Sequence, residues 1–283
     1  MNTAKRSVRP FVFLALSGCL FGAMPSAYAQ QFTVSPQMPE AYQPFALSLI
    51  VLCGGQDPNP ASVVVDMSAA AIVVVAAEDG FTCPPDRKIA HVVGVPGGTY
   101  SIERKNTPDG GIDQVYGNVT IAPAPPTQPV FAFYNEGIKH YFITAGTAER
   151  DWLLGGGGGG GWYLVDEGFN AWPAAGPAPV AAKPVCRFYS AAVNSHFYTA
   201  GPNECELLKQ PGSGWAYEGI AFRALVPTKG SCYPGTEPVW RLYNDRFAQA
   251  DSNHRFVTSA DTYRHMMANG WIGEGVAFCS PES

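Results

Sequence analysis

Three histidines recur from residue 140 onward, each followed closely by aromatic residues: His140, His196 and His254. Three imidazoles around a common axis could coordinate zinc and leave one position open for water or a substrate. Each histidine, however, shares a strand face with the residue two positions on, which is Phe or Tyr every time. A histidine on such a face usually donates its ring N–H to a backbone carbonyl or a carboxylate. We therefore expect the three histidines to be structural core residues, and we predict no metal site and no cofactor.

Arginine–tyrosine pairs precede two of these histidines. Arg187 with Tyr189, and Arg241 with Tyr243, share the outward face of an expected strand, opposite its core face, and Tyr134 takes the tyrosine position in the first copy. A guanidinium beside a phenol offers a fork of donors and a flat apolar surface, which suits a carboxylated sugar or an acidic peptide. These five residues are our ligand-binding candidates. The alternative is that each tyrosine covers a neighbouring loop while the arginine is solvated.

A Gly-Trp pair follows each histidine segment and provides Trp162, Trp215 and Trp271. One interpretation is a sugar-stacking platform on each copy, because weak sites gain avidity when they are linked. The simpler interpretation, which we adopt, is that these tryptophans pack in the core. The glycine run at residues 155–161 precedes Trp162, and we expect it to be a mobile loop. No Lys or Ser/Thr pair follows it, which disfavours a phosphate-binding loop.

Motifs typical of enzymes are missing from the sequence. It contains no Gly-x-Ser-x-Gly, no His-Glu-x-x-His and no Gly-x-Gly-x-x-Gly after an expected strand. We therefore predict a protein that is not an enzyme. A hydrolase whose active site is assembled from distant residues remains the rival prediction.

The histidine, arginine and tryptophan motifs belong to a segment that recurs about every 55 residues, a period typical of repeat architectures. The repeats cover residues 129–172, 184–225 and 238–281, and each is expected to form a strand, a hairpin loop, a strand, a short helix and a strand. One such segment is too small to bury its own apolar face. We predict a pseudo-three-fold β-rich domain at 130–283, trefoil-like or a small closed ring. Alternation in the first strand assigns six residues to the core: Phe131, Phe133, Cys186, Phe188, Trp240 and Leu242.

In combination, Tyr134-Asn135, Ser195-His-Phe-Tyr-Thr199 and Gly214-Trp-Ala-Tyr-Glu-Gly219 resemble a bacterial repeat family of unknown function. The resemblance covers about residues 129–281. It implies a carboxy-terminal triplet in a secreted or surface protein, and it implies no biochemical role. The first copy departs from the pattern, because Val165 aligns with Glu218 and Glu274, while Glu167 is shifted by two residues. A three-fold site built on that glutamate is therefore incomplete.

The segment at residues 30–122 reads as about seven short strands separated by Gly and Pro turns. This pattern predicts an immunoglobulin-like β-sandwich, so that the whole chain is mainly β. The apolar run at residues 69–77 favours a strand, since consecutive valines lose rotamer freedom in a helix. Residues 123–129 form a Pro-rich linker between the two domains.

The first 29 residues have the parts of a secretory signal peptide: basic residues, an apolar stretch and small residues before a cleavage site near Ala29. The alternative is a lipoprotein box, in which Cys19 would carry the lipid anchor. Either reading predicts a secreted, periplasmic or cell-surface protein. No other apolar stretch is long enough to span a membrane, so we expect no transmembrane span in the mature chain.

Cysteine and charge usage agree with export. Seven cysteines occur, and the six outside the expected leader contain no Cys-x-x-Cys pair, which favours disulfides over metal ligation. The predicted pairs are Cys186–Cys205 and Cys232–Cys279, followed by Cys53–Cys83. The net charge of -5 and the lack of a basic cluster after the leader argue against nucleic acid as a partner.

Together these patterns predict an exported, non-catalytic binding protein. The favoured partner is extracellular carbohydrate or a cell-envelope polymer, bound through the repeat domain, and another surface protein is second. The rival classes are the hydrolase described above and a structural or protein-interaction spacer.

Overall fold

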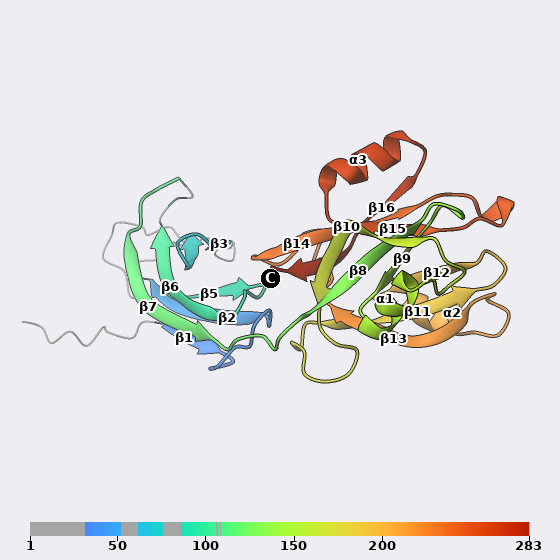
Figure 1. Ribbon diagram of the computed structural model, residues 1–283. Coiled ribbons are helices and arrows are strands. Elements are labelled where there is room, and N and C mark those ends of the chain that lie inside the picture. The colour runs from blue at the N-terminus through green and yellow to red at the C-terminus, as the bar shows by residue number, and fades with distance from the viewer. Residues whose placement is uncertain (1–31, 52–61, 76–85, 106, 108, 283) are drawn as a thin grey trace, which may run out of the picture.

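The computed structural model describes residues 32–51, 62–75, 86–105, 107 and 109–282. The chain forms an amino-terminal sandwich and a carboxy-terminal body of three sheets, and the carboxy terminus lies between the two (Figure 1). The structure is mainly β, as predicted from the sequence. The expected leader, with Cys19 and the cleavage site near Ala29, lies outside the described residues, as does the predicted Cys53–Cys83 pair.

The sandwich contains two facing sheets with the strand orders β1-β2-β5 and β3-β4-β6-β7. Its strands are β1 (Phe32–Ser35), β2 (Phe45–Val51), β3 (Ser62–Asp66), β4 (Ala71–Val75), β5 (Asp86–Val92), β6 (Gly98–Lys105) and β7 (Gln114–Ile121). The apolar run at 71–75 is a strand, as predicted. Because β4 lies between two other strands and packs on the opposite sheet, a continuous apolar run suits it. Leu47, Ile72 and Ile102 are fully buried in the core that the two sheets share.

The second body consists of three units with the same order of elements: strand, strand, helix, strand. Unit 1 contains β8 (Gln128–Asn135), β9 (His140–Thr144), α1 (Thr147–Leu154) and β10 (Trp162–Ala171). Unit 2 contains β11 (Lys183–Ser190), β12 (Ser195–Thr199), α2 (Pro202–Leu208) and β13 (Ala216–Ala224). Unit 3 contains β14 (Thr236–Tyr243), the short 3₁₀ helix η1 (Phe247–Gln249), β15 (His254–Val257), α3 (Ala260–Ala268) and β16 (Ile272–Pro281). In every unit the first strand is the central one of an antiparallel sheet.

The three units meet at a common apolar centre. Phe169, Phe222 and Phe278, one from the last strand of each unit, contact one another with ring centroids 5.6 to 6.0 Å apart. The first strands contribute the matching valines, which are all buried: Val130, Val185 and Val239. This arrangement is pseudo-three-fold, and within the described residues the three sheets are not joined into one closed barrel.

The first strand of each unit is covered on both faces, which differs from the sequence-based expectation of one core face. The predicted core residues do pack inward, but in units 2 and 3 they form a small separate core under the helix of their own unit. Phe188 and Leu242 are the fully buried centres of these two cores. The opposite face, which carries the three valines, packs against the neighbouring units. Of the predicted six, Phe131 and Trp240 are only half-buried.

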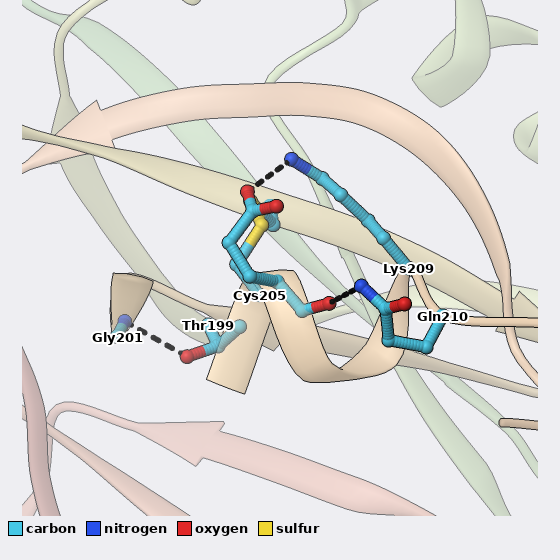
Figure 2. Close-up of a disulfide and its surroundings, with 7 residues drawn as sticks. Thr199, Gly201, Cys205, Lys209 and Gln210 are labelled. Atoms are coloured by element: carbon cyan, nitrogen blue, oxygen red, sulfur yellow. Dashed lines mark hydrogen bonds and ion pairs between the residues drawn. A yellow bond between two sulfur atoms is a disulfide. The ribbon is translucent and has the colours of Figure 1, made fainter. Parts of the chain in front are cut away.

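Two disulfides hold the units, as predicted from the sequence. Cys186–Cys205 joins β11 to α2 with a Cα–Cα distance of 6.0 Å, and Figure 2 shows it beside Thr199, whose hydroxyl accepts from the N–H of Gly201 at the helix start. Cys232–Cys279 ties the connection before unit 3 to β16, with a Cα–Cα distance of 5.5 Å. Loops of these lengths stabilise by about 3 to 4 kcal/mol each in the chain-entropy model. Disulfides are typical of extracellular proteins.

None of the helices in the described part of the chain is long and apolar enough to cross a bilayer.

The Pro-rich linker is packed between the two bodies. Trp172, which follows β10, is fully buried, and its Nε1 donates to the carbonyl of Pro125 over 2.9 Å. Tyr42 of the sandwich meets the rings of Trp172 and Tyr233 edge-on, with centroids 6.0 and 5.9 Å apart. The sandwich, the linker and the three units therefore share one apolar cluster.

The central phenylalanines should dominate the stability of the three-unit body. We expect Phe222→Ala to lower the free energy of unfolding by about 3 to 5 kcal/mol, because it leaves a cavity between three rings. All six tryptophans lie after residue 150, so tryptophan fluorescence during urea unfolding reports on this body. Phe247→Ala, at an exposed position, is the control and should change stability by less than about 0.5 kcal/mol. An equal effect of the two substitutions would contradict the central role of the phenylalanine contact.

Candidate ligand-binding cleft

Strand pairing shows which residues of the three units are equivalent. Tyr189 pairs with His196 and Tyr243 pairs with His254, whereas in unit 1 the corresponding pair is Tyr134 with Tyr141. His196 and His254 therefore occupy the same position, and His140 lies one residue earlier. The expectation of three matching histidines is wrong for unit 1, because an alignment on histidine slips the register there by one residue.

The true equivalents of His140 are Ser195 and Asn253, and all three are buried close to the meeting point of the units. Asn253 donates from Nδ2 to Ser195 Oγ over 3.0 Å and exchanges two hydrogen bonds with the backbone of Tyr141. The ring of His140 contacts the carbonyl of Asn194 and the carboxylate of Asp251, at 3.1 and 2.7 Å. These contacts make His140 a structural link between the units. Among the described residues, no three His, Cys, Asp or Glu side chains are placed to hold a metal ion.

The two arginines among the ligand candidates point toward the preceding unit. Arg187 of unit 2 lies 2.8 Å from Glu149 on α1 of unit 1 and 2.8 Å from Glu218 on β13. Their side chains were expected on an outward face, but that face is covered by the neighbouring unit. Charges at such an interface need partners, because an unpaired buried charge is costly.

Arg241 of unit 3 repeats this arrangement. It lies 2.7 Å from Glu274 and 3.6 Å from Glu204 on α2 of unit 2. Its guanidinium also lies over the ring of Phe197, 5.0 Å from the centroid. The arginines thus join units 1 to 2 and 2 to 3 in the same way.

The third interface, between units 3 and 1, uses other positions. Ala132 and Val165 replace the arginine and the glutamate there, as the shifted pattern in the sequence indicated. Instead, the guanidinium of Arg255 lies over the ring of Tyr141, 4.3 Å from the ring centroid. Nη2 of Arg255 also lies 3.8 Å from Oε1 of Glu167. Glu167 is buried and accepts from the backbone N–H of Thr258 over 2.8 Å.

The two equivalent histidines are neutral at pH 7. Burial, together with the nearby Arg187, lowers the pKa of His196 from 6.5 to about 4. Burial and Arg241 lower the pKa of His254 to about 3. The nearest carboxylate oxygens, of Glu218 and Glu274, lie 3.3 and 3.5 Å from the Nε2 atoms and do not outweigh these effects.

A cleft of about 290 Å³ opens between units 1 and 2. Unit 1 provides an aromatic wall, Trp152 on α1 and Trp162 at the start of β10, and the carboxylate of Glu149. Unit 2 provides Tyr189 and His196. The remaining lining residues are Ile138, His140, Tyr141, Phe142, Leu153, Gly158, Asn194, Ser195 and Asn253. Tyr189 donates its hydroxyl to Asn194 Oδ1 over 2.9 Å, which fixes the phenol at the edge of the cleft.

The glycine run shapes the aromatic wall. A Cβ on Gly157 would lie 2.3 Å from ring atoms of Trp152, and one on Gly158 would lie 3.1 Å from Nε1 of Trp162. The carbonyl of Gly158 accepts from that same Nε1 over 3.1 Å. The loop expected to be mobile is therefore packed against both tryptophans, and its glycines let the backbone approach the rings.

Residues 129–281 match the family model described as a domain of unknown function, DUF5648. The chain belongs to this family. The match covers all three units and both disulfides, and the sandwich lies outside it. Neither the curated proteins nor the solved structures include a significant match to this chain.

The DUF5648 domain brings only some of the predicted site residues together. Tyr189 lines the cleft with His196 and Trp162. Tyr189 and Tyr243 each pack on the histidine of their own unit, with ring centroids 4.9 Å apart, and Tyr134 packs on Tyr141 at 4.6 Å. Tyr243 and Tyr134 do not line this cleft. The tryptophans expected in the core are half-buried and lie at core edges. Trp162 packs against the central core and also lines the cleft, while Trp215 and Trp271 pack against the small cores of units 2 and 3.

Trp152, like Glu149, is a cleft residue that sequence reasoning missed. It is 58 % exposed, the equivalent position in unit 2 is Leu207, and it belongs to no repeated motif. The available signal was the combination of a tryptophan on an expected helix with a glycine run directly after it.

The histidine pKa values predict that the DUF5648 domain loses stability in acid. Because the unfolded chain binds protons near pH 6.5 and the folded histidines do not, the free energy of unfolding falls as the pH drops from about 6.5 toward 4. For His196 the loss amounts to about 3 kcal/mol at most over that range. We expect His196→Gln to flatten this part of the pH profile in urea unfolding. His265→Gln, on the exposed side of α3, should leave the slope unchanged. An unchanged slope in the His196 variant would refute the assignment.

The contact of Gly157 with Trp152 can be tested by a double-mutant cycle. We expect Gly157→Ala to cost about 1 to 3 kcal/mol of stability, because the new Cβ displaces the indole ring. In a Trp152→Ala background the same change should cost little, since the ring is absent. Equal costs in the two backgrounds would show that the loop does not position Trp152.

Proposed function

We propose that this chain is an exported, non-catalytic binding protein that recognises carbohydrate or a cell-envelope polymer. The proposed site is the cleft between units 1 and 2 of the DUF5648 domain. The observation that carries the proposal is the meeting of Trp152, Trp162 and Tyr189 with the polar side chains of His196 and Asn194 in one cleft.

A sugar ring has an apolar face of C–H groups and a rim of hydroxyl groups. Aromatic rings offer flat apolar surface for the first, and Tyr and Trp also carry a polar atom for the second. A few placed polar groups on an aromatic wall are what orient small ligands in protein clefts. The volume of about 290 Å³ is at the lower end of ligand sites, which suits one sugar residue of a longer polymer.

Export is supported by two lines of reasoning. The two disulfides are typical of proteins outside the cytoplasm. The first 29 residues carry the features of a signal peptide, with lipid anchoring at Cys19 as the alternative. Its expected membership of a bacterial repeat family of secreted and surface proteins agrees with this location.

The proposal is tested by screening the protein on arrays of glycans and cell-envelope polymers. We expect binding that is lost in Trp152→Ala, because the wall loses its most exposed ring. Leu207→Ala is the matched control, since Leu207 occupies the equivalent position on α2 and is 68 % exposed. In the same way Tyr189→Ala should abolish binding, and Tyr243→Ala, its equivalent in unit 3, should not.

Other outcomes separate the rival functions. Turnover of generic ester, peptide or glycoside substrates would support the hydrolase. Capture of a surface protein without any glycan binding would support a protein-interaction module. Binding that survives both Trp152→Ala and Tyr189→Ala would exclude this cleft as the site.

A further inference from the structure

The side chains that line the cleft carry an acidic charge. Among the described residues, Glu149 is the acidic residue that lines the cleft, and no lysine or arginine lines it. The nearest guanidinium belongs to Arg187, which lies 2.8 Å from Glu149 and also 2.8 Å from Glu218. One positive charge thus faces two negative charges, and the cluster keeps a net negative charge.

His196, which lines the cleft, does not offset that charge. His196 is neutral at pH 7, since burial and Arg187 lower its pKa to about 4. The ring of His140 is held by Asp251, which is itself 2.5 Å from Arg246. An anionic group entering the cleft would therefore meet a carboxylate without a free cation beside it.

The aromatic wall favours the opposite charge. Trp152, Trp162 and Tyr189 line the cleft, and the faces of aromatic rings attract ammonium groups, most strongly those of tryptophan. The carboxylate of Glu149 and the three rings thus act in the same direction. A protonated amine on a sugar satisfies both, while the ring carbons of that sugar still stack on the wall.

We infer that the cleft selects a sugar residue bearing a protonated amine over neutral sugars, and neutral sugars over those bearing a carboxylate or a phosphate. This inference rests on the proposed function and names the ligand class of the same cleft. It reverses the ligand class suggested by the sequence, in which Arg187 was offered to a carboxylated sugar, because the structure commits that guanidinium to Glu149 and Glu218.

The test compares three oligosaccharides of equal length, built from glucosamine, N-acetylglucosamine and galacturonic acid, by titration calorimetry at about pH 6, where His196 is neutral. We expect the glucosamine oligomer to bind about five- to tenfold more tightly than the N-acetylated one, as one exposed charge pair and one cation–π contact allow. The galacturonic acid oligomer should bind most weakly. Added salt should reduce the difference between the charged and neutral ligands.

Glu149→Gln isolates the charge. We expect it to reduce the preference for glucosamine to less than twofold while the N-acetylglucosamine oligomer still binds, and that retained binding shows that the cleft is intact. Glu206→Gln is the control, since Glu206 is exposed on α2 and pairs with Lys209. It should keep the wild-type preference.

The outcomes distinguish the inference from the proposed function. If none of the three oligosaccharides and no arrayed glycan binds, the proposed function fails. If the N-acetylated oligomer binds while the galacturonic acid oligomer binds as tightly as the glucosamine oligomer, the function stands and the charge selection is overturned. A preference that Glu149→Gln leaves unchanged overturns it as well. Should Glu149→Gln not fold, the wild-type ranking and its salt dependence decide alone.

Discussion

The structure depends on one constraint. Each unit has one three-stranded sheet and one short helix, and that helix can cover only one of the two faces of the sheet. In units 2 and 3 the helix covers the face that carries Phe188 or its equivalent, Leu242. The other face must be covered by the neighbouring units, and the contact of Phe169, Phe222 and Phe278 does this for all three at once. A segment of about 40 residues has too little interior to fold alone, so the units stabilise one another.

This sharing brings unlike parts of the chain together. The helix of one unit meets the first two strands of the next, and polar groups that reach this boundary must find partners there. Arg187 and Arg241 are paired across two boundaries, and the shifted Glu167 serves the third. The cleft opens at the first boundary, where Trp152 of α1 and Trp162 of β10 line it together with Tyr189.

Much of this fold could be predicted from the sequence, and the misses have physical causes. The strands of the sandwich, the order of elements in each unit and the pairs Cys186–Cys205 and Cys232–Cys279 follow from local patterns that tertiary packing does not alter. Alternation identifies two faces of a strand but does not say that both are covered, so Arg187 was expected outside. His140 was matched to the wrong residues because register depends on strand pairing. Trp152 occurs in one unit only, so no repeat could indicate it.

The comparison of the first two boundaries shows what distinguishes the proposed binding cleft from the equivalent interface. Arg241 faces two carboxylates, Glu204 and Glu274, so the boundary between units 2 and 3 has the same balance of charge as the cleft. It differs at the helix, where Leu207 stands in place of Trp152 and no glycine run follows. The charge cluster is therefore explained by the need to pair arginines between units, whether or not a ligand binds. Of these two boundaries, the first has the aromatic wall. Because this wall lies beside an acidic cluster of the kind that both boundaries share, we expect the first boundary to be selective for a cation.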